Sequence, residues 1–263
     1  MHTRYPLLLV HGLGMKDCFF LRSFGWIDRL LRIQGYEVYV SRVDAMGSIE
    51  GNAAQLKEEI LAITEKCGAD RVNIIAHSKG GLDAKYMMLN LGMAKHVASL
   101  TTLCTPHKGS PVATGILRVP KIFLRPVAAL VNGFFRLLGD KNPDSMRACE
   151  QLQRVQGELD WETLHIADDV YCQSFSATMK RGRKKADFVM RIPLMFSRYM
   201  EKDVETDGLV PRDSAIFGVY RGDVMEDSVS HAEMVDFMVS DKKRDKIYAF
   251  YSALCEELVQ MGF

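Results

Sequence analysis

The sequence lacks three features, and each absence excludes a class of protein. It has no apolar run near the roughly 20 residues that span a bilayer, so no transmembrane segment is expected. Its charges balance, with 34 Lys and Arg against 33 Asp and Glu, and a net charge of +1 gives no general attraction to nucleic acid. Its six cysteines form no close pair and no metal-type spacing, so they give no signal of a disulfide-rich or zinc-binding protein and agree with a reducing compartment.

The sequence also lacks the marks of a leader or of a second domain. The N-terminal apolar stretch covers only residues 7–10, which is too short for a signal peptide, so the chain as written is expected to be cytoplasmic. A leader removed beforehand would leave the same sequence. No repeat, low-complexity tract or linker interrupts the 263 residues, of which 48% are hydrophobic, and a single domain over residues 1–263 is predicted.

Short apolar runs alternate with helical patterns along the chain. Strands are predicted at residues 5–10, 37–43, 72–76, 99–104, 170–175 and 216–220. Apolar stripes with helical spacing end before Gly35, Gly68 and Gly92, and a last stripe (Ile247, Tyr251, Leu254, Leu258) predicts a C-terminal packing helix. This alternation predicts an α/β fold in which helices cover both faces of a mostly parallel sheet.

The most informative stretch runs from residue 72 to residue 81, VNIIAHSKGG. A buried-strand pattern stops at Ser78, which has Ala76 and Gly80 two positions to either side, and a helical pattern follows. Small residues at these positions allow the strained strand-to-helix turn that exposes a nucleophilic serine. The alternative is that Ser78 only caps the following helix.

A serine nucleophile needs a base, an acid that orients the base, and donors for the oxyanion. The strand at residues 5–10 ends at His11-Gly12-Leu13-Gly14, where glycines allow a sharp turn that points amides into a cavity. The backbone N–H groups of Leu13 and Lys79 are therefore the expected oxyanion hole. His11 and His77 flank these motifs and are expected to tie loops together through hydrogen bonds.

Four blocks occur in one order: residues 11–14 (HGLG), 76–81 (AHSKGG), 105–110 (TPHKGS) and 206–211 (TDGLVP). Together they resemble the bacterial triacylglycerol lipases of the α/β-hydrolase superfamily. The resemblance implies an α/β-hydrolase fold and hydrolysis of acyl esters, with an acyl-ester or lipid substrate. The serine chemistry itself needs no metal or organic cofactor. Residues 112–164 carry no matching motif.

The base must follow both Ser78 and the acid in an α/β-hydrolase chain. His165 and His231 are the candidates beyond the third block, and His231 matches the late histidine of the family. Among the acids crowded into residues 203–213, Asp207 matches the family's Asp-Gly pair, whose turn can present a carboxylate to an imidazole. The alternative is that this pair marks only a turn.

The expected function is thus a serine carboxylester hydrolase, of the lipase or esterase type, that uses Ser78, His231 and Asp207 and forms an acyl-enzyme. An acyltransferase or thioesterase could use the same triad. A non-catalytic binding module is a further alternative, because fold alone does not determine function. It is disfavoured because a retired site has no reason to keep all three residues in order.

Three features are left open by the sequence. Glu233 stands where the resembling lipases often have an Asp that helps to bind a structural calcium, so calcium is neither required nor excluded. An insertion at about residues 111–164, apolar at residues 122–138, is expected to form a helical lid or a packed cap. The basic run at residues 180–185 is expected at a solvated hairpin tip, with weak contact to a membrane surface or lipid droplet as the alternative.

Overall fold

A computed structural model describes residues 2–18, 22–154, 169–180 and 188–263. His165 and most of the basic run at residues 180–185 lie outside these residues. The strands are β1 (Leu7–Val10), β2 (Val38–Val40), β3 (Val72–His77), β4 (Val97–Leu103), β5 (Tyr171–Ser176) and β6 (Val219–Asp223). The main helices are α1 (Ile27–Ile33), α2 (Ile49–Cys67), α3 (Lys79–Asn90), α4 (Pro111–Ile116), α5 (Lys121–Leu137), α6 (Ser145–Gln151), α7 (Phe188–Met200) and α8 (Asp241–Gln260).

All six strands pair in parallel, in the order β2-β1-β3-β4-β5-β6. The predicted parallel sheet is therefore confirmed. The strands at its centre are buried on both faces, which explains why they read as continuous apolar runs rather than as alternating patterns.

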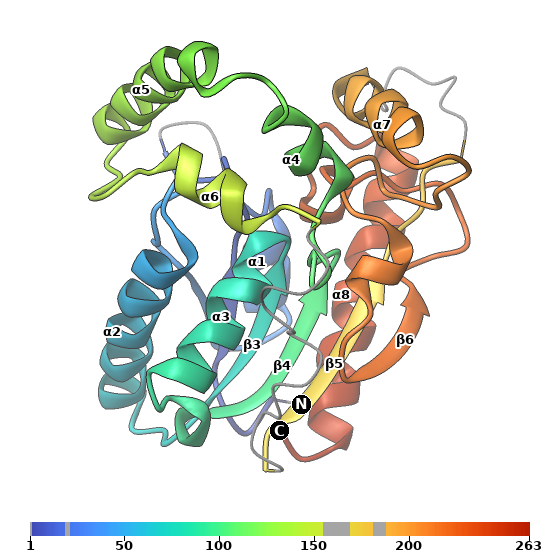
Figure 1. Cartoon of the computed structure of the whole chain (residues 1–263). Coiled ribbons are helices and arrows are strands. Elements are labelled where there is room, and N and C mark those ends of the chain that lie inside the picture. Colours follow the sequence, from blue (N-terminus) through green and yellow to red (C-terminus); the bar gives the residue numbers. More distant parts are fainter. Residues whose placement is uncertain (1, 19–21, 155–168, 181–187) are drawn as a thin grey trace.

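Strand β1 shows how the core is divided between the two faces of the sheet. Leu7 and Leu9 belong to the cluster that packs against α1 and α8, whereas Leu8 and Val10 belong to the cluster that packs against α2 and α3. This alternation follows from the two-residue period of a strand. The sheet is thus covered by helices on both sides, as the sequence predicts (Figure 1).

Two elements differ from the predicted boundaries. The apolar stripe before Gly35 includes Phe20 and Phe24 in the sequence and so predicts a helix that starts early. Among the described residues α1 starts only at Ile27, because Gly25 has a φ of +49° and turns the chain just before the helix. The run expected as a strand at residues 216–220 forms β6 only from Val219 to Asp223. Elsewhere the predicted strands lie within two or three residues of the observed ones.

Helices α4, α5, α6 and α7 gather at the end of the molecule to which the strand arrows point (Figure 1). Three of them, α4 to α6, come from the segment expected as an insertion. Helix α4 packs closely on α7, since a Cβ placed on Gly115 would lie 2.2 Å from the Phe196 ring. No helix within the described part of the chain is long and apolar enough to cross a membrane.

Candidate active site

Ser78 occupies the turn between β3 and α3 in a conformation that L-residues rarely adopt. Its φ is +55° and its ψ is −132°, and the residue before it ends the strand while the residue after it begins the helix. Such a strained residue persists only where its surroundings hold it in place. Here the Ser78 N–H donates to the Leu103 carbonyl at 2.9 Å, and the Thr105 hydroxyl donates to the Ser78 carbonyl at 2.8 Å.

The glycines after Ser78 are required by close packing. A Cβ on Gly80 would lie 2.5 Å from the His11 carbonyl oxygen and 2.7 Å from that of Val10, and a Cβ on Gly81 would lie 2.3 Å from the Thr105 hydroxyl. No real side chain fits at these distances. The helix after the turn therefore packs directly on the ends of β1 and β4, which fixes the position of Ser78.

The loop that follows β1 runs beside the Ser78 side chain. A Cβ on Gly12 would lie 2.5 Å from the Ser78 Cβ and 3.1 Å from its Oγ. The next residue is Leu13. Among the described residues, the backbone N–H groups of Leu13 and Lys79 donate no hydrogen bond to another backbone group. Both amides are therefore available to a ligand.

Asp207 and His231 form a buried hydrogen-bonded pair. The His231 Nδ1 lies 2.6 Å from Asp207 Oδ2, and the two residues are 6% and 1% exposed. Asp207 Oδ1 accepts hydrogen bonds from the backbone N–H groups of Leu209 (2.9 Å) and Val210 (2.8 Å). The carboxylate is thus held from both sides, in a tight turn where Gly208 has a φ of +108°.

His77 links this pair to the turn at Ser78. Its Nε2 lies 3.1 Å from the His231 carbonyl oxygen, and the two imidazole rings are 4.5 Å apart. Burial, followed by the charge of His231, lowers the pKa of His77 well below its usual value, so its ring is neutral at pH 7. His77, the residue just before Ser78, therefore ties the loop of His231 to the end of β3. This is the loop-tying role that the sequence predicts. His11, whose Nδ1 lies 3.1 Å from the Gly12 carbonyl oxygen, contacts the other loop.

The Lys79 side chain turns away from Ser78 and forms a buried ion pair. Its Nζ lies 2.7 Å from Asp83 Oδ1, and Asn52 donates to Asp83 Oδ2 at 3.0 Å. Burial raises the pKa of Asp83 to about 6 against the opposing effect of Lys79. The pair was not identified from the sequence, although the i, i+4 spacing of the two charges is a signal for it.

Glu233 is fully buried and has a cation partner from within the chain. Both of its carboxylate oxygens lie 2.8 Å from the Lys243 Nζ, and Oε2 also accepts the Ser230 N–H at 2.9 Å. Among the described residues, the cluster of potential metal ligands consists of Cys104, Asp207 and His231, and does not include Glu233. The surroundings of Glu233 therefore do not fit a calcium ion.

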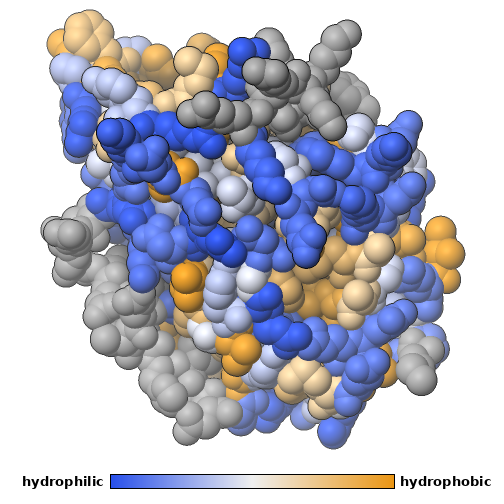
Figure 2. All heavy atoms as spheres, turned by 90° about the vertical axis from the view of Figure 1, so that its right-hand side faces the viewer, coloured by the Kyte–Doolittle hydropathy of each residue, from blue (hydrophilic) through white to orange (hydrophobic). Residues whose placement is uncertain are grey.

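Helix α5 presents an apolar stripe to solvent. Five residues at helical spacing are between 55% and 88% exposed: Phe123, Val127, Leu130, Phe134 and Leu137. On α7, Ile192, Met195 and Tyr199 are between 65% and 84% exposed. Neither helix contains an acidic residue. Hydrophobic side chains are visible at the upper end of the molecule, the end that carries both helices (Figure 2).

The end of α5 is attached to the loop after β2. Asp140, three residues beyond the helix, accepts the N–H groups of Ala45 (3.1 Å) and Met46 (2.9 Å) and pairs with Lys16 at 2.6 Å. Its side chain is fully buried. One end of α5 is therefore fixed while its apolar stripe stays exposed.

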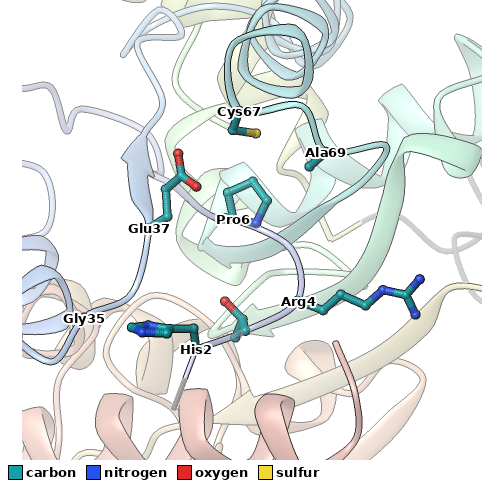
Figure 3. A pocket seen from close by; sticks show the side chains of 8 residues that line it. His2, Arg4, Pro6, Gly35, Glu37, Cys67 and Ala69 are labelled. Atoms are coloured by element: carbon teal, nitrogen blue, oxygen red, sulfur yellow. The ribbon is translucent and has the colours of Figure 1, made fainter.

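A separate pocket of about 310 Å³ lies among the segments that lead into β1, β2 and β3 (Figure 3). Its lining includes His2, Arg4, Glu37 and Cys67. These residues precede the strands, whereas Ser78 follows one. The pocket is therefore at the opposite end of the parallel sheet and is not part of the candidate site.

Comparison with known proteins agrees with the resemblance read from the four blocks. No protein-family profile matches the chain. It is 34% identical over 167 residues to triacylglycerol lipases of Pseudarthrobacter phenanthrenivorans and Burkholderia plantarii, which covers 59% of this chain and 52% and 46% of theirs. It is 25% identical over 268 residues to triacylglycerol lipase 2 of Saccharomyces cerevisiae, covering 90% of this chain and 73% of that one. The chain thus spans about half the length of these bacterial relatives.

Solved structures show the same fold. A metagenomic carboxyl esterase matches with a TM-score of 0.67 at 19% identity, covering 96% of this chain and 76% of the other. The mature form of a Bacillus licheniformis lipase matches with a TM-score of 0.62 at 19% identity, covering 95% and 92%. The expected α/β-hydrolase fold and the resemblance to triacylglycerol lipases are therefore confirmed.

Proposed function

We propose that the protein is a serine carboxylester hydrolase of the lipase or esterase type, with Ser78 as nucleophile, His231 as base and Asp207 as the orienting acid. The observation that carries the proposal is the strained turn at Ser78, together with a buried His231–Asp207 pair bound to the adjacent residue, His77. The lipases and the esterase that resemble the chain support the same chemistry.

The site residues divide the reaction between them. The Nδ1–H of His231 donates to Asp207, which leaves Nε2 free to accept the Ser78 proton as Ser78 Oγ attacks the acyl carbonyl. The Leu13 and Lys79 N–H groups receive the oxyanion, each contributing about 3 kcal/mol of transition-state stabilisation. His231 then gives its proton to the leaving alkoxide, and water, deprotonated by His231, cleaves the acyl-enzyme to release the acid.

This chemistry uses no metal or organic cofactor. At the position where the resembling lipases often have an Asp that helps to bind calcium, the positive charge next to Glu233 comes from the Lys243 ammonium. All six cysteines are free thiols, which supports a reducing, cytoplasmic location.

The substrate surface consists of the exposed stripes on α5 and α7. A helix that exposes a continuous apolar stripe and carries only cations is suited to lie at a lipid–water interface. The cap formed by α4, α5 and α6 within a single domain of residues 1–263 acts as a lid, and its exposed stripe contacts lipid substrate or a membrane or droplet surface.

The test is hydrolysis of p-nitrophenyl esters from short to long acyl chains by the native protein, Ser78→Ala and the control Ser252→Ala on α8. The proposal requires activity in the native protein and the control and its loss in Ser78→Ala. An optimum at long chains identifies a lipase, and one at short chains an esterase. Added alcohol that diverts most acyl groups to a new ester would instead favour an acyltransferase. Full activity in Ser78→Ala would refute the proposal.

A further inference from the structure

Cys104 has a backbone conformation that glycine would adopt at lower cost. It follows the last residue of β4 and has a φ of +51°, in the left-handed region that disfavours side chains. Its N–H donates to the Phe175 carbonyl at 2.9 Å, and its side chain is buried. A strained residue of this kind next to a reactive site indicates that its side chain has a role.

The thiol of Cys104 faces the acid and base of the candidate site. Its Sγ, a carboxylate oxygen of Asp207 and a ring nitrogen of His231 all lie within 4.8 Å of one another, and all three residues are buried. Burial raises the pKa of Cys104 well above its usual value, and the neighbouring Asp207 raises it further. The group therefore stays a neutral thiol, which can donate a hydrogen bond to a carboxylate but cannot compete with Ser78 as an ionised nucleophile.

Asp207 depends on such donors because water does not reach it. It is 1% exposed, and a buried carboxylate is stable only when its lone pairs are satisfied. Oδ1 has two backbone donors, from Leu209 and Val210, whereas Oδ2 has only His231 among the described nitrogen and oxygen donors. A thiol donor would complete this arrangement.

We infer that Cys104 is a positioning residue whose S–H donates to the Asp207 carboxylate and holds it in place for His231. The inference rests on the proposed function, since positioning matters only if His231 and Asp207 act on Ser78. Three other ionisable groups act on this cluster: His77 at the end of β3, whose ring lies 4.5 Å from that of His231, and Asp223 at the end of β6 and Tyr251 on α8, which interact electrostatically with Cys104. Burial lowers the pKa of His77 and raises that of Tyr251, so both are neutral at pH 7.

The test compares Cys104→Ser, Cys104→Ala and Cys104→Gly with Cys255→Ala, a matched control that removes another buried thiol from the same core cluster. Serine keeps a donor, alanine removes it, and glycine removes it while relieving the backbone strain. Four readouts are kcat, KM, the pH profile of kcat/KM and the downfield proton resonance of the His231 Nδ1–H. Each variant is first checked for stability by urea unfolding.

Positioning predicts that kcat falls about five- to tenfold in the Ala and Gly variants with little change in KM, because one hydrogen bond to a charged group is lost. The acid limb of the pH profile moves to higher pH, because the carboxylate, with one donor fewer, holds the imidazolium more strongly. The Nδ1–H resonance moves as well, while Cys104→Ser and Cys255→Ala stay close to native. Cys104→Gly should be more stable than Cys104→Ala and equally impaired.

Native kcat and an unmoved Nδ1–H resonance in Cys104→Gly would overturn the inference and leave Cys104 as core packing. So would a loss in Cys255→Ala equal to that in Cys104→Ala. The resonance is measured without substrate, so it tests Cys104 even if ester hydrolysis is not found. Failure of the proposed function is thereby distinguished from failure of this inference.

Discussion

Replacing Asp207 by Asn should stop catalysis while preserving the fold, and the structure indicates how. The two backbone N–H groups of Leu209 and Val210 both point at Oδ1, and only an oxygen can accept them. The Asn amide must therefore keep its oxygen there and place its NH₂ group where Oδ2 now accepts from His231. Two donors would then face each other across 2.6 Å.

This conflict is relieved when His231 moves its proton from Nδ1 to Nε2. The Nε2 atom then carries a proton and cannot accept one from Ser78, so kcat should fall roughly 10⁴-fold, as for a triad locked in the wrong tautomer. Asp207→Ala should lose as much activity, and it also leaves two buried N–H groups without an acceptor. That variant should lose a further 1–3 kcal/mol or so of stability.

The assay is kcat for a p-nitrophenyl ester, with urea unfolding of both variants at the same pH. The reasoning requires Asp207→Asn to be inactive and close to native in stability, and Asp207→Ala to be inactive and less stable. Activity of Asp207→Asn within tenfold of native would refute the assigned role of Asp207. Equal destabilisation by the two variants would refute the argument about amide orientation.

Three further predictions concern charge and stability. Lys79→Met should lower the free energy of unfolding by about 3–5 kcal/mol, because it leaves Asp83 buried without a cation. The double variant Lys79→Met/Asp83→Leu should recover most of this loss, as measured by urea unfolding. A single variant as stable as the double variant would contradict this prediction. Treatment with EDTA should leave the melting temperature unchanged. Lys243→Met should lower the melting temperature, because it leaves the buried Glu233 carboxylate without its cation. A native melting temperature that depends on calcium would contradict this prediction. Stability should fall as the pH drops through about 6.5, because burial lowers the pKa of three histidines that the unfolded chain protonates, at about 1.4 kcal/mol per pH unit for each proton. The raised pKa of Asp83, about 6, works in the opposite direction, because below that pH the folded protein gains one proton that the unfolded chain does not. A stability that rose from pH 7 to pH 5 would contradict the predicted net loss. These histidines are His11, His77 and His107.

Local sequence was enough to predict the centre of the fold. Strands β1, β3 and β4 are buried on both faces, which is the environment that their short, continuous apolar runs predict in an α/β domain. The turn at Ser78 could also be predicted from local sequence, because close contacts require glycine at both positions after it: Gly80 lies against the His11 and Val10 carbonyl oxygens, and Gly81 lies against the Thr105 side chain.

Contacts between segments that are far apart in the sequence could not be predicted from local patterns. Helix α1 begins at Ile27 because Asp236, some 210 positions along the chain, packs against Gly25 and accepts the Trp26 N–H at 3.1 Å. Its own local pattern favours an earlier start. The thiol of Cys104 beside Asp207 is a similar case, because the two residues come from different loops and no sequence pattern relates one to the other.

The exposed stripe on α5 was predicted only in part. Its apolar character is evident from the sequence at residues 122–138, but whether these side chains are buried depends on what packs against them. In the structure only Ala128 of the helix is buried. Periodicity cannot distinguish an apolar stripe that faces a core from one that faces solvent.

The most direct test of the account is labelling with a p-nitrophenyl alkylphosphonate, followed by intact-mass measurement and peptide mapping. The account predicts one adduct per chain, located on Ser78, absent in Ser78→Ala and much slower to form in His231→Ala. No adduct on the native protein, or an adduct on a residue other than Ser78, would contradict the claim that Ser78 is an activated nucleophile.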